Sequence, residues 1–181
     1  MEDQKSQFLN PSFIINQVDV NQGMQVGDLG CGSGYISFAL ASTVGEKGKA
    51  YSVDIQKGVL DQVKKEAQAK GLDNLVTIWS DLEVIGAAKI QNNVLDKVFL
   101  ANILFQVEDK RAIFAEAKRM LKPEGNLIVV DWKKGDTAIG PHQEKRLDLA
   151  NITQLAQESG LIEVKQIDAG KYHFGIVFKP V

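Results

Sequence analysis

The stretch VGDLGCGSG at residues 26–34 decides the fold of this chain. It follows a short apolar run that is typical of a strand, and apolar residues at helical spacing come after it. Glycines at alternate positions let the backbone turn sharply and approach a ligand without interference from Cβ atoms. The stretch therefore predicts a strand, a glycine-rich turn that contacts a ligand, and a helix.

An acid, Asp28, precedes the first glycine of this turn. A dinucleotide fingerprint would place a further glycine where this chain has Tyr35, and a phosphate loop would carry Gly-Lys followed by Ser or Thr. A carboxylate beside the turn repels phosphate and attracts a cationic or amino-bearing group. The turn therefore favours such a ligand over a dinucleotide.

Further strands and helices alternate outward from this turn. Short β-branched runs predict strands at residues 24–29, 49–54, 76–79, 96–101 and 126–132, and a terminal hairpin at 162–167 and 173–178. Helices of amphipathic period lie between them. Asn10-Pro11 is typical of a helix start, and Asn151 with Gln154 predicts a capping box for the last helix. We expect an α/β, Rossmann-like, doubly wound fold whose seven-stranded sheet is mostly parallel, with a C-terminal antiparallel edge hairpin.

Composition limits the class of protein. The 181 residues predict one domain, 1–181, and the balance of 21 basic against 23 acidic residues argues against a nucleic-acid partner. Cys31 is the only cysteine, so an internal disulfide and a cysteine-built zinc site are excluded. The polar start and the absence of a long apolar run predict a cytoplasmic protein without a membrane span.

Two more acids follow predicted strand ends. Asp54 ends the second strand, where a carboxylate can accept hydrogen bonds from both hydroxyls of a ribose. Asp81 follows the third strand and can reach the amino group of an adenine. S-adenosylmethionine carries adenine, a ribose diol, a sulfonium and an α-amino acid, so it fits these acids together with Asp28.

In motif order, residues 22–132 resemble the class I S-adenosylmethionine-dependent methyltransferases, a broad group that includes ubiquinone- and menaquinone-pathway enzymes. Asp28-x-Gly30-x-Gly32-x-Gly34 resembles the first motif, and residues 121–127 resemble a late Leu-Lys-Pro-Gly-Gly motif in which Glu124 replaces a glycine. The resemblance implies S-adenosylmethionine as cofactor. The cofactor-binding residues that it implies are Asp28, Gly30, Cys31, Gly32, Gly34, Asp54, Ile55, Asp81, Leu82 and Asn102.

No catalytic set is evident from the sequence, and no metal is expected because Asn102 and Asp131 leave a metal site incomplete. The candidate catalytic residues are Asn102, Asp131 and His142. Asp131 has three open interpretations: a helix cap, a substrate base or a solvated loop acid. His173 is interpreted as a histidine on a strand face.

The expected function is direct in-line methyl transfer to a small molecule. The alternatives are an NAD(P)-dependent oxidoreductase and a non-catalytic nucleotide-binding partner subunit. The sequence decides neither the acceptor and its methylated atom nor the oligomeric state.

Two segments are expected to cover the site. Residues 1–20, with Phe8, Leu9, Phe13 and Ile14, form an N-terminal helix or lid, and residues 133–150 form an active-site loop. The alternative for the first helix is packing on the flank of the sheet.

Overall fold

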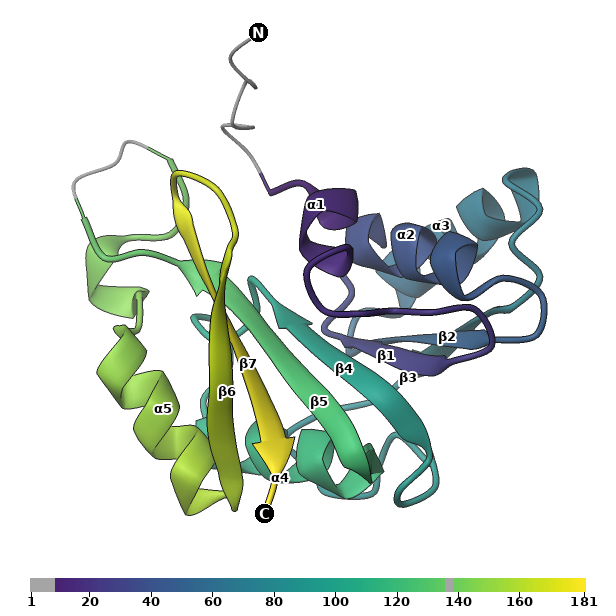
Figure 1. Cartoon of the computed structure of the whole chain (residues 1–181). Helices are drawn as coiled ribbons and strands as arrows, with labels where there is room; N and C mark the ends of the chain where they lie inside the picture. The colour runs from purple at the N-terminus through teal and green to yellow at the C-terminus, as the bar shows by residue number, and fades with distance from the viewer. Residues whose placement is uncertain (1–8, 136–138) are drawn as a thin grey trace, which may run out of the picture.

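A seven-stranded sheet forms the centre of the molecule (Figure 1). The structure is a computed structural model that describes residues 9–135 and 139–181. The strands follow the order β3-β2-β1-β4-β5-β7-β6, which confirms the predicted fold class. The strands are β1 (Gln25–Leu29), β2 (Lys49–Asp54), β3 (Leu75–Trp79), β4 (Leu95–Ala101), β5 (Leu121–Trp132), β6 (Leu161–Asp168) and β7 (His173–Pro180).

The first five strands run parallel, and β7 lies antiparallel between β5 and β6. The order reverses between β1 and β4, which are neighbours although β2 and β3 intervene in the sequence. Ligands of such sheets bind outside the carboxyl ends of the strands at this reversal. β5 begins at Leu121 rather than at residue 126, because Leu121 already pairs with Leu95.

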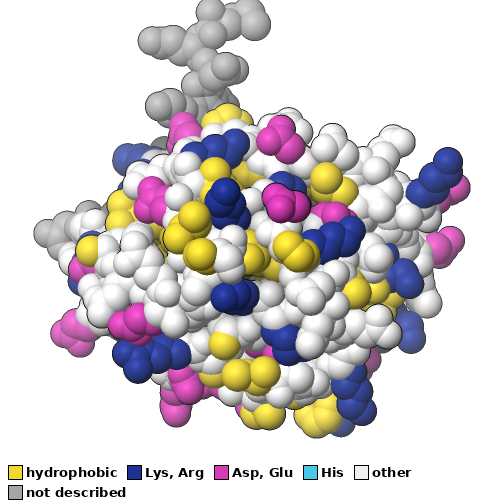
Figure 2. All heavy atoms as spheres, turned by 60° about the horizontal axis from the view of Figure 1, so that its bottom comes forward, with side chains coloured by type: hydrophobic (Ala, Val, Ile, Leu, Met, Phe, Trp, Pro, Cys, Tyr) yellow, Lys and Arg dark blue, Asp and Glu magenta, His cyan; other side chains and the backbone are white. Residues whose placement is uncertain are grey.

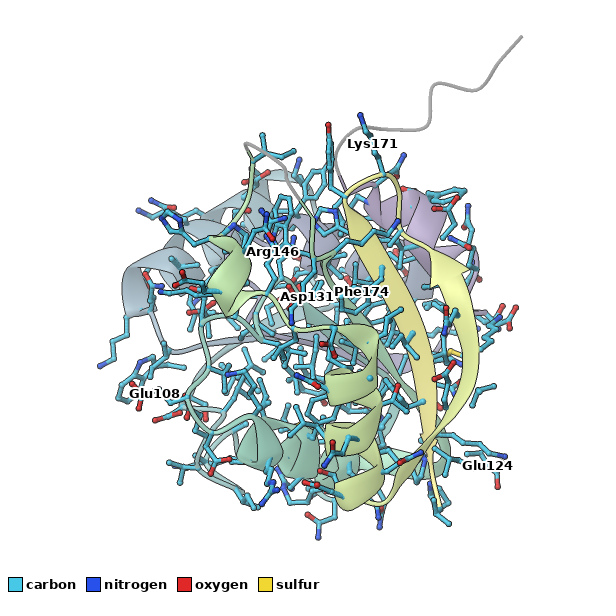
Figure 3. All side chains as sticks on the ribbon, turned by 90° about the vertical axis from the view of Figure 1, so that its left-hand side faces the viewer. Glu108, Glu124, Asp131, Arg146, Lys171 and Phe174 are labelled. Carbon is cyan, nitrogen blue, oxygen red and sulfur yellow. The ribbon has the colours of Figure 1, made fainter. Side chains whose placement is uncertain are left out.

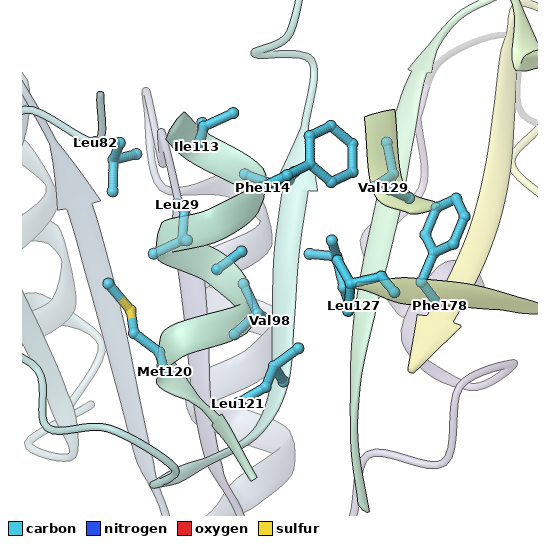
Figure 4. Close-up of a cluster of buried hydrophobic side chains, with 14 of the residues drawn as sticks. Leu29, Leu82, Val98, Ile113, Phe114, Met120, Leu121, Leu127, Val129 and Phe178 are labelled. Atoms are coloured by element: carbon cyan, nitrogen blue, oxygen red, sulfur yellow. The ribbon is translucent and has the colours of Figure 1, made fainter. Parts of the chain in front are cut away.

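Helices cover both faces of the sheet. α4 and α5 pack on one face, where Val98, Leu127 and Val129 point into their cluster (Figure 4). α1 and α2 pack on the other face, against Ile128 and Val130. Because successive strand residues point to opposite faces, β5 contributes to both cores. The helices are α1 (Pro11–Ile15), α2 (Tyr35–Val44), α3 (Lys57–Ala69), α4 (Lys110–Met120) and α5 (Leu149–Glu158), with a 3₁₀ turn at Gln143–Lys145.

Two predicted helix starts have different outcomes. Asn10 caps α1 as expected: its side-chain oxygen accepts a hydrogen bond from the Phe13 amide over 3.2 Å. The capping box at Asn151 is wrong, because Asp148 caps α5 three residues earlier. Asp148 Oδ1 accepts the Asn151 amide hydrogen over 2.9 Å, so Asn151 lies in the first turn.

On the face shown in Figure 2, acidic and basic side chains are interspersed rather than gathered by sign. Among the helices of the described residues, none combines the length and the apolar character that crossing a membrane requires.

Candidate active site

A cavity of about 500 Å³ opens at the carboxyl ends of the parallel strands. The turn after β1 and the residues that follow β2 and β3 line one end of it. The ends of β4 and β5 and the start of β7 line the other end. The cavity therefore lies where the order of the strands reverses, as the fold predicts.

The glycine turn meets two different steric demands. A Cβ atom on Gly30 would lie 1.8 Å from Ile103 Cδ1, so this glycine is required by packing. Gly32 has a left-handed φ of +49°, and a Cβ there would meet no atom within 4 Å. Because Gly32 lines the cavity, its missing side chain leaves that space to a ligand. Gly34, which precedes α2, does not line the cavity.

Asp54 is buried at the end of β2 and lines the cavity. Its Oδ2 accepts a hydrogen bond from the Gly32 amide over 3.0 Å, and its Oδ1 accepts one from the Gln56 amide over 2.9 Å. Each carboxylate oxygen can accept a second hydrogen bond. Asp54 can therefore hold the turn in place and still accept hydrogen bonds from a diol.

Asp28 lies at the end of β1 with only 2% of its surface exposed. The Ser37 hydroxyl donates a hydrogen bond to Asp28 Oδ2 over 2.6 Å. Burial raises the pKa of the Asp28 carboxyl to about 6, against the opposing effect of the Ser37 bond, and the nearby Asp54 charge adds to the rise. A cationic group in the cavity would favour the charged carboxylate.

The remaining predicted cofactor residues lie around the same end of the cavity. Asp81 is exposed, and its Oδ1 accepts the Glu83 amide hydrogen over 2.9 Å. Ile55 and Leu82 line the cavity from the turns after β2 and β3. Burial raises the pKa of the Cys31 thiol, and the nearby charge of Asp28 is the second cause of the rise. This cysteine therefore stays protonated and is a poor nucleophile.

Asn102 follows β4 and lines the cavity. Its backbone is left-handed, with φ of +55°, and its amide donates a hydrogen bond to the Val130 carbonyl over 2.9 Å. Its side-chain oxygen is buried without a hydrogen-bond partner. Strained backbone and an unpartnered polar atom are typical of functional positions.

Asp131 does not line the cavity. It lies inside β5, 4% exposed, next to Phe174 of β7 (Figure 3). It is therefore neither a helix cap nor a solvated loop acid. Its carboxylate accepts hydrogen bonds from the Leu104 amide over 3.1 Å and from the Trp132 amide over 2.7 Å. The bond from Leu104 fixes the turn after β4. Burial raises the pKa of the Asp131 carboxyl to about 6.

His142 is exposed at the start of the 3₁₀ turn and is not among the residues that line the cavity. The loop that carries it is held by Arg146, which is buried. The Arg146 guanidinium donates hydrogen bonds to the carbonyls of Pro141, Lys133 and Ile139, at 2.8, 3.1 and 2.7 Å. Within the expected loop 133–150, residues 136–138 lie outside the described residues.

Trp132 and His173 are among the cavity residues that sequence reasoning missed. Trp132 ends β5 and His173 begins β7, and both line the cavity. They are paired across the strands, with ring centroids 4.2 Å apart. Only the antiparallel register of β5 and β7 brings them together, and no local pattern in the sequence encodes that register.

The described part of the N-terminal segment contacts both the cavity and the core. Leu9 lines the cavity, whereas Ile14 and Ile15 of α1 belong to the core beside α2. Phe13 is 46% exposed and does not line the cavity, and Phe8 lies outside the described residues. In residues 9–135 and 139–181, no group of three or more histidine, cysteine, aspartate or glutamate side chains could hold a metal ion.

Comparisons with known proteins agree with this geometry. A family model described as a methyltransferase domain matches residues 20–172. The ubiquinone/menaquinone biosynthesis C-methyltransferase UbiE of Shewanella piezotolerans is 31% identical over 163 residues, which are 90% of this chain and 61% of that protein. This chain thus spans about half to three fifths of the length of the curated UbiE relatives that it matches.

Two solved structures match over nearly their whole length. A SAM-dependent methyltransferase from Aquifex aeolicus has a TM-score of 0.89 and 26% identity, with 99% of this chain and 94% of that chain covered. A putative type 11 methyltransferase from Sulfolobus solfataricus has a TM-score of 0.78 and 30% identity, with 96% and 93% covered. The chain belongs to the class I S-adenosylmethionine-dependent methyltransferases, and S-adenosylmethionine is the cofactor that this membership implies.

Proposed function

We propose that this chain transfers the methyl group of S-adenosylmethionine to a small-molecule acceptor by direct in-line displacement. One observation carries the proposal: a single cavity has buried acids at one end and apolar and aromatic side chains at the other. The first end suits the cofactor, and the second leaves room for an acceptor.

The residues at the first end fit the cofactor. Asp28 suits an amino group, and Asp54 suits a ribose diol, because carboxylates accept hydrogen bonds from such donors. Gly32 provides the space that a side chain would fill. Asp81, Leu82 and Ile55 line the same cavity, which supports a role for them beside the adenine.

When bound, S-adenosylmethionine supplies a methyl group that its sulfonium has already activated. The protein therefore has to align the acceptor and exclude water rather than activate the donor. Correct alignment of two reactants can lower a barrier by about 7–11 kcal/mol. Asn102 is suited to this task because it lines the cavity after β4, the strand next to β1, on a backbone that Asp131 fixes through Leu104.

A panel of metabolites tests this function directly. The full chain is incubated with methyl-labelled S-adenosylmethionine and each candidate acceptor, and labelled products are identified by mass spectrometry. A labelled small molecule supports the proposal. Cofactor binding without a product from any acceptor would instead favour a non-catalytic nucleotide-binding subunit, and binding of NAD alone would favour an oxidoreductase.

A further inference from the structure

The sheet ends in two edge strands, β3 and β6, which differ in how they are protected. β6 carries charges at Glu163, Lys165 and Asp168, and its register shifts between Glu163 and Lys165. Charges and bulges on an edge strand hinder pairing with another chain. β3 has the sequence LVTIW, without a charge or a proline, and its register with β2 is regular over all five residues. β3 is therefore an edge that is open to another strand.

Backbone groups on the free side of β3 lack partners. The Ser80 amide, just after the strand, donates a hydrogen bond to the Asp54 carbonyl of β2 over 3.1 Å. Successive residues of a strand direct their backbone groups to opposite sides, so Thr77 and Trp79 direct theirs away from β2. In the part of the chain that the structure describes, no hydrogen bond reaches these backbone groups. Leu75 has the same orientation, and its amide already donates to a carbonyl of the preceding turn.

Exposed side chains mark the two ends of this edge. Trp79 is 57% exposed and Ile55 is 56% exposed, and the Trp79 indole Nε1 donates a hydrogen bond to the Ile55 carbonyl over 2.8 Å. The Lys57 ammonium lies 4.1 Å from the centre of the Trp79 ring, whereas Asp81, beyond this end, belongs to the cavity wall. Asp73 is exposed in the turn that leads into the strand. The edge thus has an aromatic ring and a cation at one end and an acid at the other.

A second copy of β3 complements this edge. Two identical strands that pair antiparallel are related by a two-fold axis, and an axis at Thr77 places Trp79 of each copy opposite Leu75 of the other. The two Thr77 residues then exchange hydrogen bonds, and each Trp79 amide can donate to the opposite Leu75 carbonyl. An axis at any other residue leaves part of the strand unpaired. The same axis brings Lys57 of each copy to the end that carries Asp73 of the other, so the charges are complementary.

We propose that the β3 edge is a self-association surface, on which a second copy of this chain pairs its own β3 in the antiparallel direction. The sheet then continues through both copies and covers part of the exposed Trp79 ring. Each cavity opens at the carboxyl ends of its own strands, so the two cavities lie at opposite ends of the joined sheet and neither blocks the other. The inference is independent of methyl transfer.

Sedimentation equilibrium of the full chain over a concentration series measures this association. We expect the mean mass to rise from that of one chain to that of two and no further, because a two-fold axis closes the assembly. Thr77→Pro removes the outward amide donor and spares the bonds to β2, so the Kd of the dimer should rise about tenfold or more. Val164→Pro makes the same change at an exposed position of β6 and should leave this Kd unchanged. Circular dichroism checks the fold of both variants.

Charge reversal tests whether the occupant is a second copy. Lys57→Glu and Asp73→Lys each place like charges across the two-fold axis, so each variant alone should dimerise about threefold to tenfold more weakly. In an equal mixture, the mixed dimer has opposite charges at both contacts. The mixture should therefore recover the affinity of the wild type, which a partner other than this chain could not produce.

Three results would overturn the proposal. A wild type that stays monomeric at every concentration would leave the edge to a strand from another protein. A dimer that Thr77→Pro leaves intact would place the contact on another surface. Charge-reversal variants that stay weak in the mixture would contradict the antiparallel two-fold register. None of these results bears on the methyltransferase proposal, because none of the substituted residues lines the cavity.

Discussion

The Gly32 amide donates a hydrogen bond to Asp54 Oδ2 over 3.0 Å, which joins the glycine turn after β1 to the end of β2. The residues predicted to bind the amino-acid part and the ribose of the cofactor are thus parts of one unit. Asp54 also accepts the Gln56 amide hydrogen, so its carboxylate holds the backbone of both the glycine turn and the turn after β2. The acid has a structural role before any ligand arrives.

Removal of this carboxylate should weaken cofactor binding. Charge-assisted hydrogen bonds contribute about 1.5–3 kcal/mol each, so Asp54→Ala should raise the Kd for S-adenosylhomocysteine about tenfold to a hundredfold. Calorimetry measures the Kd, and circular dichroism checks the fold. Asp61→Ala, an exposed acid of α3, is the control and should bind normally. An unchanged Kd in Asp54→Ala would place the ribose elsewhere.

Gly32 and Gly71 allow backbone strain to be separated from loss of ligand space. Both have left-handed φ angles, +49° and +68°, and a Cβ at either would meet no atom within 4 Å. Valine should therefore lower the free energy of unfolding at both sites by at least about 1–2 kcal/mol. Only Gly32→Val should also abolish S-adenosylhomocysteine binding, because only Gly32 lines the cavity. Equal affinities in the two variants would contradict this position of the cofactor.

The parts of the site that were predictable from the sequence are those built from one strand and the turn after it. Asp28, Gly32 and Asp54 each belong to such a unit, so local spacing was enough to place them at one cavity. The start of α5 was harder, because Asp148 and Asn151 are both good capping residues and lie three residues apart. Only the side-chain hydrogen bond of Asp148 decides between them.

Residues that depend on distant partners were not predictable. His173 is a cavity residue because the register of β5 and β7 pairs it with Trp132. His142 was the histidine that the sequence favoured as a candidate catalytic residue, with His173 interpreted as a strand-face histidine. In the structure Arg146 binds the carbonyls of the loop, and His142 lies on the surface. Such outcomes depend on contacts between segments, which spacing along the chain does not encode.

Cofactor affinity should depend on the protonation of Asp28. Its pKa is raised to about 6 in the free protein, and a bound amino group favours the charged form. Below pH 6, binding must first remove a proton, so the Kd for S-adenosylhomocysteine should rise up to about tenfold for each pH unit. Calorimetry between pH 5 and pH 8 measures this dependence. Asp28→Asn should bind more weakly with a flatter pH profile, and an equally steep profile would assign the effect to another group.

Asp131 should make the stability of the protein depend on pH. Its folded pKa of about 6 lies above its ordinary value of 3.8, so its stabilising contribution is present at low pH and is lost as the pH rises through 6. Between pH 7 and pH 5 the wild type should gain about 1 kcal/mol more than Asp131→Asn. Urea unfolding at both pH values measures this difference. Parallel changes in the two proteins would show that Asp131 is not the titrating group.

Ligand-dependent unfolding tests the central claim, that this cavity binds S-adenosylmethionine rather than a dinucleotide. Urea unfolding is measured with S-adenosylhomocysteine and with NAD, each up to saturation and without added metal. A ligand that binds only the folded state stabilises it by about 2.7 kcal/mol at one hundred times its Kd. We predict this gain for S-adenosylhomocysteine and none for NAD. Stabilisation by NAD alone would contradict the account.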